Sequence, residues 1–221
     1  MTSLFNSVLA EVKLSYNLRL AHGASSMQDY KIATLFSIPL KVQRIKHVAE
    51  IVWHPPRTGT VKLNCDGSST GSHPCGAIGI VIRDSQFVFL GAISSNIGHA
   101  TPLDAEFCAC MLAIEKAMEL GLSNICLETD SIKVVNAFHK MMGVPWKMRV
   151  RWHNCLCFCH RITCVCVHIH REGNLVADAL ARHGQGLSMF SSQWWPAPPT
   201  FIHSLLDRDR LGLSSAILSM I

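Results

Sequence analysis

The sequence lacks the features that would place a protein in or across a membrane. Its 221 residues contain no run of about 18 uncharged apolar residues, so we expect no transmembrane span. The first twenty residues have no basic segment ahead of an apolar one, which argues against a secretory signal. We therefore expect an intracellular protein, nuclear or cytoplasmic, with no membrane partner.

Charged residues are also scarce. Only 16% of the residues are charged and 49% are apolar, which is typical of a chain that folds around a core rather than one that stays disordered. A chain of this length can hold one sizeable core with extensions, or at most two small domains.

Cysteine is abundant, but the spacing typical of disulfide scaffolds or zinc sites is missing. Without an export signal, the ten cysteines are expected to be reduced thiols. Residues 155–170 are rich in Cys and His, yet they do not form the two short knuckles of paired ligands that zinc usually needs. If residues 152–160 are helical, Cys155 and Cys159 share a face and Cys157 points away. Buried thiols are our main interpretation, and a structural zinc site is the alternative.

The net charge of +5 comes from one segment. Residues 140–183 contain seven Lys or Arg and two acidic residues, whereas basic and acidic residues cancel in the rest of the chain. A local basic surface suits a polyanion, although an ordinary solvated face can have the same composition.

Proline and glycine divide the chain into segments. Residues 1–52 show weak helical periodicity around 4–18 and 42–51, and the sequence WHPPRTG that follows predicts a stiff linker. We expect a domain over residues 60–184, with an N-terminal extension and Pro-rich linker over 1–59. Residues 185–221 are expected to be a C-terminal tail that begins with another linker, up to residue 200.

The first half of the expected domain reads as strands followed by a helix. Three strand-like runs separated by short turns predict an antiparallel meander: residues 61–66, 77–83 and 86–95. A helix follows over residues 101–121, with Thr101 as N-cap, Pro102 at its first position and Gly121 at its end.

The second half alternates strands and helices. A short strand from residue 124 leads into a helix, and a second helical segment covers about 146–161. The apolar run at 163–169 predicts a central strand. Asn174 is expected to cap a last helix that closes at Gly184.

Four acidic residues lie at strand ends or on apolar helix faces. Asp66 ends an apolar run, Glu106 lies on or beside the apolar face of its helix, Asp130 ends a strand and Asp178 is flanked by apolar residues. Each has an ordinary alternative, such as a turn at Asp66 or an N-cap at Asp130. Two bare carboxylates about 4 Å apart repel by roughly 4 kcal/mol near a protein surface, so a cluster of them needs cations. Oxygen donors alone favour Mg²⁺ or Mn²⁺, and two such ions can drive phosphodiester hydrolysis.

Four motifs, in this order and spacing, resemble type 1 ribonuclease H, and most closely the plant RNase H-like domain of non-LTR retroelement reverse transcriptases: KLNCDGSS, DAEFCACMLAIEKA, LETDSIKVVNAF and HIHREGNLVADALAR. The resemblance covers about residues 60–184. It implies an α/β RNase H-like fold, in which helices flank a five-stranded mixed sheet whose first three strands are antiparallel. It also implies that two Mg²⁺ ions, or Mn²⁺, assist cleavage of the RNA strand of an RNA–DNA hybrid and are bound by Asp66, Glu106, Asp130 and Asp178.

The resemblance further implies a catalytic histidine that assists proton transfer or product release. His168, ten residues before Asp178, has the matching position, although His170 could fill the same loop and a histidine that merely ends a strand is the alternative. The basic handle of bacterial relatives is missing, because only a short segment joins Met141 to Trp146. The side chains that we expect to contact nucleic acid phosphates are Lys147, Arg149, Arg151 and Arg171.

Two functions remain open at this point. The presence of all four acids favours an active, metal-dependent hybrid nuclease. The absence of a polymerase region and the weakly patterned ends favour a catalytically inactive, domesticated retroelement fragment that binds nucleic acid or another protein.

Overall fold

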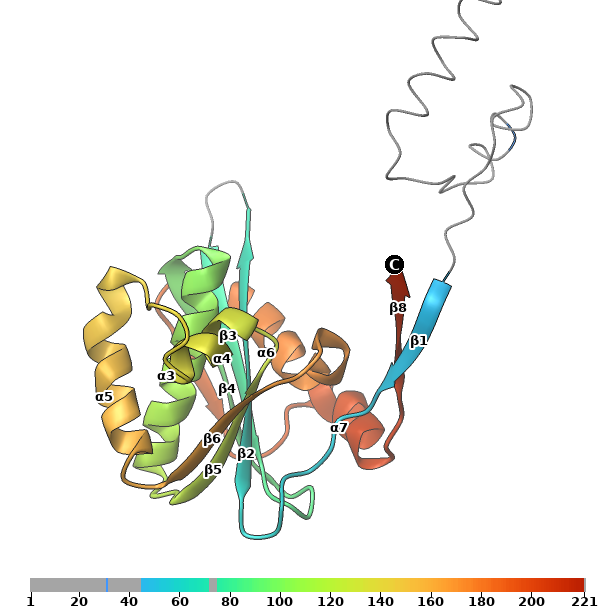
Figure 1. Cartoon of the computed structure of the whole chain (residues 1–221), viewed down its shortest axis with the longest axis horizontal. Coiled ribbons are helices and arrows are strands. Elements are labelled where there is room, and N and C mark those ends of the chain that lie inside the picture. The colour runs from blue at the N-terminus through green and yellow to red at the C-terminus, as the bar shows by residue number, and fades with distance from the viewer. Residues whose placement is uncertain (1–30, 32–44, 72–74, 221) are drawn as a thin grey trace, which may run out of the picture. The chain divides into compact units, whose positions relative to one another are not determined.

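The computed structural model describes residue 31, residues 45–71 and residues 75–220 (Figure 1). It separates into two compact units, and the larger one is Glu50–Ala216. The helical periodicity expected at 4–18 lies outside the described residues. The helix expected at 42–51 is wrong for its described part, because β1 (Ile45–Ile51) is a strand that pairs with β8 (Ser215–Met220) in a two-stranded sheet. Pairing with a segment so distant in sequence leaves no trace in a local apolar pattern.

A six-stranded mixed sheet forms the centre of the larger unit. Its order is β6-β5-β2-β3-β4-β7. The strands are β2 (Val61–Thr70), β3 (Cys75–Arg83), β4 (Phe89–His99), β5 (Asn124–Thr129), β6 (Thr163–His168) and β7 (Ser192–Trp195). β2, β3 and β4 are antiparallel, and β5 runs parallel to both β2 and β6. The predicted α/β class with a mixed sheet is therefore confirmed, with β7 as an additional strand.

Helices cover both faces of this sheet (Figure 1). One group comprises α3 (Pro102–Glu119), α4 (Ile132–Phe138) and α5 (Arg149–Cys159), and the other comprises α6 (Leu175–Gln185) and α7 (His203–Arg210). Short 3-10 turns precede α5, α6 and α7 at Trp146–Met148, Arg171–Gly173 and Thr200–Ile202. Two apolar clusters fill the layers, a large one under α3 and a smaller one under α6. Among the described residues, no helix has the length and apolar character needed to cross a membrane.

Helix α3 begins where its sequence predicts. The Thr101 side chain accepts a hydrogen bond from the backbone N–H of Asp104 at 3.2 Å, and Asp104 accepts one from the Thr101 N–H at 3.1 Å. This reciprocal capping box satisfies two N–H groups that the helix would otherwise leave unpaired. The buried stripe packs on β2 and β3 and includes Phe107, Cys110, Ile114 and Ala117.

Strand β6 forms where predicted, but its expected central place in the sheet is wrong. It is an edge strand that pairs with β5 alone within the described chain. Val165 and Val167 are 48% and 37% exposed, while Cys166 is buried. An apolar run indicates a preference for extended structure, but it carries no information about which strands will lie beside it.

Residues 53–59 form no helix or strand, as expected for a linker, but parts of both predicted linkers pack into the folded unit. Trp53 is buried in the core. Residues 192–195 form β7, which pairs antiparallel with β4, and Ile202 is fully buried in the smaller apolar cluster. The prolines around these segments end extended stretches, but the large apolar side chains beside them bury enough surface to hold the segments against the sheet.

The ten cysteines are all free thiols. Cys155 and Cys159 are buried on the inner side of α5, and Cys157 lies toward the outside, as the helical spacing predicts. Cys155 donates a weak hydrogen bond to the backbone oxygen of Met111 in α3. These thiols therefore contribute to the packing between α5 and α3.

Candidate functional site

Asp66 lies on β2 just beyond the end of the parallel pairing with β5. That pairing ends at Cys65, opposite Thr129. Because side chains alternate along a strand, Asp66 shares a face of the sheet with Lys62 and Asn64. All three of these polar side chains are buried.

Two glycines allow helices to reach this end of β2. A Cβ at Gly67 would overlap the backbone of α3 at Glu106. A Cβ at Gly79, which pairs with Asp66 across the strands, would overlap the backbone of α6 in the turn that carries Asp178. The absence of these two side chains therefore determines how close the helical carboxylates come to Asp66.

Three of the four predicted carboxylates converge. Asp66, Glu106 and Asp130 each offer an oxygen atom, and these atoms lie within 4.8 Å of one another. One oxygen of Glu106, Oε2, and one of Asp130, Oδ1, are buried and have no hydrogen-bond partner among the described residues. Buried polar atoms are rarely left unpaired, and a set of carboxylate oxygens matches the ligand preference of Mg²⁺ or Mn²⁺. These residues therefore fit a divalent cation.

The metal-free cluster disfavours ionisation of its own members. Burial, together with the charges of Asp130 and Asp178, raises the pKa of Asp66 to about 7. Burial and the charges of Asp66 and Asp130 raise the pKa of Glu106 to about 9. Burial also raises the pKa of Asp130, while the positive charge of Arg171 opposes that rise. A bound cation would reverse this preference by favouring the charged carboxylates.

Asp178 is buried near this cluster but has other partners. Arg182 contacts its Oδ2 at 2.7 Å, and Arg171 contacts its Oδ1 at 3.3 Å. Both arginine side chains are about two-thirds exposed or more. In this structure, two arginines therefore neutralise the fourth carboxylate while the other three face one another.

The two candidate histidines lie together at the end of β6. The His168 Nε2 atom is 3.2 Å from the backbone oxygen of Asp130, and the side chain is exposed. The His170 ring packs edge-on against it at 5.6 Å. His168 therefore contacts the loop that carries Asp130, and His170 packs against His168.

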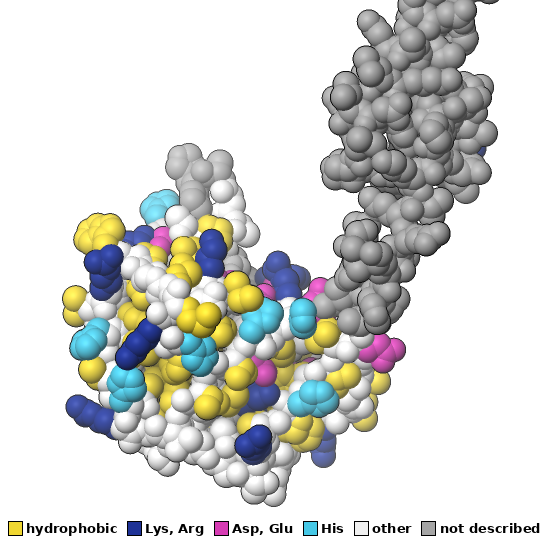
Figure 2. Space-filling view, viewed as in Figure 1, with side chains coloured by type: hydrophobic (Ala, Val, Ile, Leu, Met, Phe, Trp, Pro, Cys, Tyr) yellow, Lys and Arg dark blue, Asp and Glu magenta, His cyan; other side chains and the backbone are white. Residues whose placement is uncertain are grey.

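Three of the four bases expected to bind nucleic acid are paired with acids. Lys147 contacts Asp104 at 2.6 Å, Arg171 contacts Asp178, and Arg151 donates two hydrogen bonds to Glu115. Within the described residues, Arg149 donates a hydrogen bond to the backbone oxygen of Val144 and forms no ion pair with an acid. On the face shown in Figure 2, Lys and Arg side chains are dispersed among apolar and His side chains. Composition located the basic segment, but it did not show that acids from other elements engage its members.

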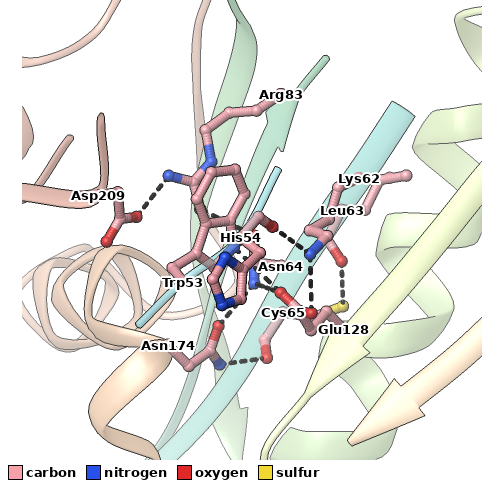
Figure 3. Close-up of polar contacts among 10 residues, drawn as sticks. All are labelled: Trp53, His54, Lys62, Leu63, Asn64, Cys65, Arg83, Glu128, Asn174 and Asp209. Carbon is pink, nitrogen blue, oxygen red and sulfur yellow. Dashed lines mark hydrogen bonds and ion pairs between the residues drawn. The ribbon is translucent and has the colours of Figure 1, made fainter. Parts of the chain in front are cut away.

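Sequence reasoning missed a second group of polar residues beside the carboxylates. We call it the buried polar cluster (Figure 3), and its members are Trp53, Lys62, Asn64, Arg83, Glu128, Asn174 and Asp209. Glu128 accepts hydrogen bonds from Trp53, Lys62 and Asn64 at 2.7–3.0 Å. The two-residue spacing of Lys62, Asn64 and Asp66 was the available signal, because it puts three polar side chains on one face of a core strand.

Arg83 joins the two ends of the buried polar cluster. Its guanidinium lies 3.6 Å from the centre of the Trp53 ring, donates to Asn64 at 2.9 Å and pairs with Asp209 of α7 at 2.5 Å. The Arg83 side chain on β3 therefore contacts a segment before the predicted domain, at Trp53, and a segment after it, at Asp209.

The comparisons with known proteins agree with this architecture. The reverse transcriptase-like family matches residues 64–184. A protein of Arabidopsis thaliana that is provisionally named a ribonuclease H is 32% identical over 164 residues, which are 73% of this chain and 26% of that protein. The chain thus spans about a quarter of the length of this relative.

Solved structures of ribonucleases H1 are also similar. The enzyme of the halophilic archaeon Halobacterium salinarum is 27% identical with a TM-score of 0.53, and the match covers 57% of this chain and 98% of that one. LC11-RNase H1, solved in complex with an RNA/DNA hybrid, is 26% identical with a TM-score of 0.52. The match covers 58% of this chain and 99% of that one. The chain belongs to the reverse transcriptase-like family. Its larger unit contains an RNase H-like domain, which confirms the resemblance to ribonuclease H.

Proposed function

We propose that this protein hydrolyses the RNA strand of RNA–DNA hybrids and that Mg²⁺ or Mn²⁺ assists the reaction. The observation that carries the proposal is the convergence of Asp66, Glu106 and Asp130. Two of these residues have a buried oxygen with no hydrogen-bond partner in the described part of the chain. The similarity to a ribonuclease H1 that was solved with a hybrid supports the substrate class. Such a substrate fits an intracellular location, nuclear or cytoplasmic.

In this proposal, four carboxylates hold two cations. Asp66, Glu106 and Asp130 supply oxygens that already face one another. Asp178 becomes a further ligand when its ion pairs with Arg171 and Arg182 break. When bound, such ions activate a water molecule and stabilise the leaving oxygen of a phosphodiester. Burial of the carboxylates keeps competing water away from the ligand oxygens, which strengthens their electrostatic action.

The exposed side chains around the cluster handle protons and phosphates. His168 presents an exposed imidazole beside the Asp130 loop, where it can take up or deliver a proton. Arg149 has no acidic partner in the described structure and is the base most available to a phosphate. Lys147, Arg151 and Arg171 contribute by exchanging a carboxylate for a phosphate, which makes binding dependent on salt.

A second function is favoured by one observation, the pairing of Asp178 with Arg171 and Arg182. If these two pairs persist, both oxygens of Asp178 stay engaged by arginines and compete poorly as ligands of a second cation. The domain would then bind nucleic acid or protein without cutting it.

A matched pair of substitutions on α3 tests the proposed function. Glu106→Gln removes a carboxylate that would be charged beside a bound cation, whereas Glu119→Gln makes the same chemical change at an exposed position of the same helix. We expect Mg²⁺-dependent cleavage of the RNA strand by wild type and by Glu119→Gln, and a loss of orders of magnitude in Glu106→Gln. Single-stranded RNA and duplex DNA are the control substrates. Absence of metal-dependent cleavage by wild type would favour the binding function, and equal cleavage of all substrates would contradict the ribonuclease H assignment.

A further inference from the structure

Asn174 has an unusual set of partners for a residue in front of a helix. It lies between the 3-10 turn Arg171–Gly173 and α6, where the sequence predicts an N-cap, and its side chain is buried. An N-cap asparagine normally accepts a hydrogen bond from a backbone N–H of the first turn. Here the side chain makes no such bond. Its hydrogen-bonding groups are used for contacts outside the helix.

The side-chain amide of Asn174 connects α6 to β2. Its Nδ2 donates to the backbone oxygen of Cys65 at 3.0 Å, and its Oδ1 accepts from the Nδ2 of Asn64 at 3.2 Å (Figure 3). The backbone oxygen of Asn174 accepts the helical hydrogen bond from the N–H of Asp178 at 3.1 Å. One residue thus contacts the peptide unit just before Asp66 and the turn that carries Asp178.

The buried polar cluster fixes the orientation of this amide. The Oδ1 of Asn64 accepts hydrogen bonds from Trp53 and Arg83, and its Nδ2 donates to the carboxylate of Glu128. Because its oxygen already accepts two hydrogen bonds, Asn64 faces Asn174 with an N–H donor. The side-chain oxygen of Asn174 must therefore be the acceptor. The amide N–H groups of Asn174 are then directed at the carbonyl of Cys65.

We propose that Asn174 is a positioning residue that holds Asp66 and Asp178 in the relation needed to bind a divalent cation. The inference rests on the proposed function, because it concerns the same metal-binding carboxylates. Asn174 is only 2% exposed, so it has no route to direct contact with a nucleic acid. Its influence passes through the two backbone segments that it joins, as residues behind metal ligands commonly act.

The test measures Mn²⁺ affinity of the full chain by electron paramagnetic resonance of the free ion. We expect Asn174→Ala to weaken Mn²⁺ binding by about 10- to 100-fold, the usual effect of removing a group that orients metal ligands. Asp209→Asn is the control, because it weakens the far end of the same buried polar cluster without touching β2 or α6 at the carboxylates. It should lower the stability of the metal-free protein and leave Mn²⁺ affinity at the wild-type value.

A kinetic measurement separates positioning from general destabilisation. At saturating Mn²⁺, Asn174→Ala should lower kcat for hybrid cleavage and leave KM for the hybrid unchanged. If alanine prevents folding, Asn174→Leu has similar size and no hydrogen-bonding group, and it serves for the same measurements. Wild-type Mn²⁺ affinity in the folded Asn174 variant would overturn the inference, as would an equal loss in Asp209→Asn. Failure of wild type itself to bind Mn²⁺ would instead overturn the proposed function, and the inference with it.

Discussion

Asp66 and Gly79 are paired across β2 and β3, and the missing side chain at Gly79 leaves the space that the backbone of α6 occupies. Gly79 has no functional side chain, but it sets the distance between two elements that carry carboxylates. These are α6, with Asp178, and β2, with Asp66. The atoms of α6 that come closest to this glycine belong to its backbone, namely the oxygen of Ala177 and the nitrogen of Ala181.

Gly79→Ala should therefore destabilise the protein. The added methyl group overlaps helix backbone, which cannot move aside as a flexible side chain can, so we expect a loss of about 1–3 kcal/mol in the free energy of unfolding. Urea denaturation measures it. Gly143→Ala is the control and should be close to neutral, because nothing lies within 4 Å of its added Cβ. Equal stability of the two variants would show that α6 does not pack on β3 as described.

The stability of the metal-free protein should fall as the pH rises from 5 to above 9. The pKa of Asp66 is raised from 3.8 to about 7 and that of Glu106 from 4.5 to about 9, so the folded state holds protons that the unfolded chain has released. Their contribution to stability is complete below the unfolded values and is lost as pH passes the folded ones. Denaturation in the presence of a chelator tests this fall. Glu106→Gln should flatten its upper part, and an unchanged slope in that variant would contradict the raised pKa of Glu106.

Asp178→Asn should abolish cleavage at little cost in stability. The ion pairs that it loses involve exposed arginines, and each such pair contributes about 0–1 kcal/mol. Removing its charge also relieves repulsion with Asp66. Gel assays of hybrid cleavage and thermal denaturation of the same sample give the two results. Cleavage at the wild-type rate would exclude Asp178 from the metal site.

Glu115→Gln should strengthen hybrid binding. This substitution releases Arg151, which now donates two hydrogen bonds to the Glu115 carboxylate, and a released arginine can contact a phosphate. We expect tighter binding at low salt and a salt dependence steeper by about one unit of slope. Fluorescence anisotropy with a labelled hybrid measures both. Glu119→Gln on the same helix is the control, and the same response in both variants would mean that net charge alone is responsible.

Residues 60–184 alone should fold poorly, although this segment carries the family match. Cutting at these boundaries removes Trp53 and Asp209, two of the three partners of Arg83 within the buried polar cluster, and leaves Asn64. Breaking a buried ion pair by removing one member typically costs about 3–5 kcal/mol. Circular dichroism of this fragment and of residues 50–216 makes the comparison. Equal thermal stability of the two would show that the flanking segments are dispensable.

Much of the fold could be predicted because its elements carry local signals. Thr101 and Asp104 form a capping box with a recognisable spacing, and Gly121 ends the helix with a positive φ of 66°. The order of the four acid-containing motifs predicted which carboxylates form the candidate site. Three of them converge. Asp130 follows the end of β5 as predicted, whereas the predicted strand end at Asp66 is wrong, because β2 continues to Thr70.

The remaining features depend on contacts between distant segments. β7 pairs with β4, and β1 pairs with β8. The residue patterns of β7 and β1 do not indicate which strand each of them will pair with. The engagement of Arg171 by Asp178 and of Lys147 by Asp104 likewise depends on how helices and loops pack. Composition predicted a basic surface. In the folded chain, acidic side chains form ion pairs with several of these basic residues and neutralise their charge.

The exposed edge of β6 has a consequence for the behaviour of the protein at high concentration. The strand TCVCVH carries no Lys, Arg, Asp or Glu, and Val165 and Val167 are partly open to solvent. An uncharged edge strand is a template for another strand, either from a second copy or from an unfolding chain. Arg161 and Arg171 lie just outside its two ends, where they act as gatekeepers: parallel, in-register stacking of two copies would bring like charges together. High salt screens that repulsion, so self-association through β6 should increase with ionic strength.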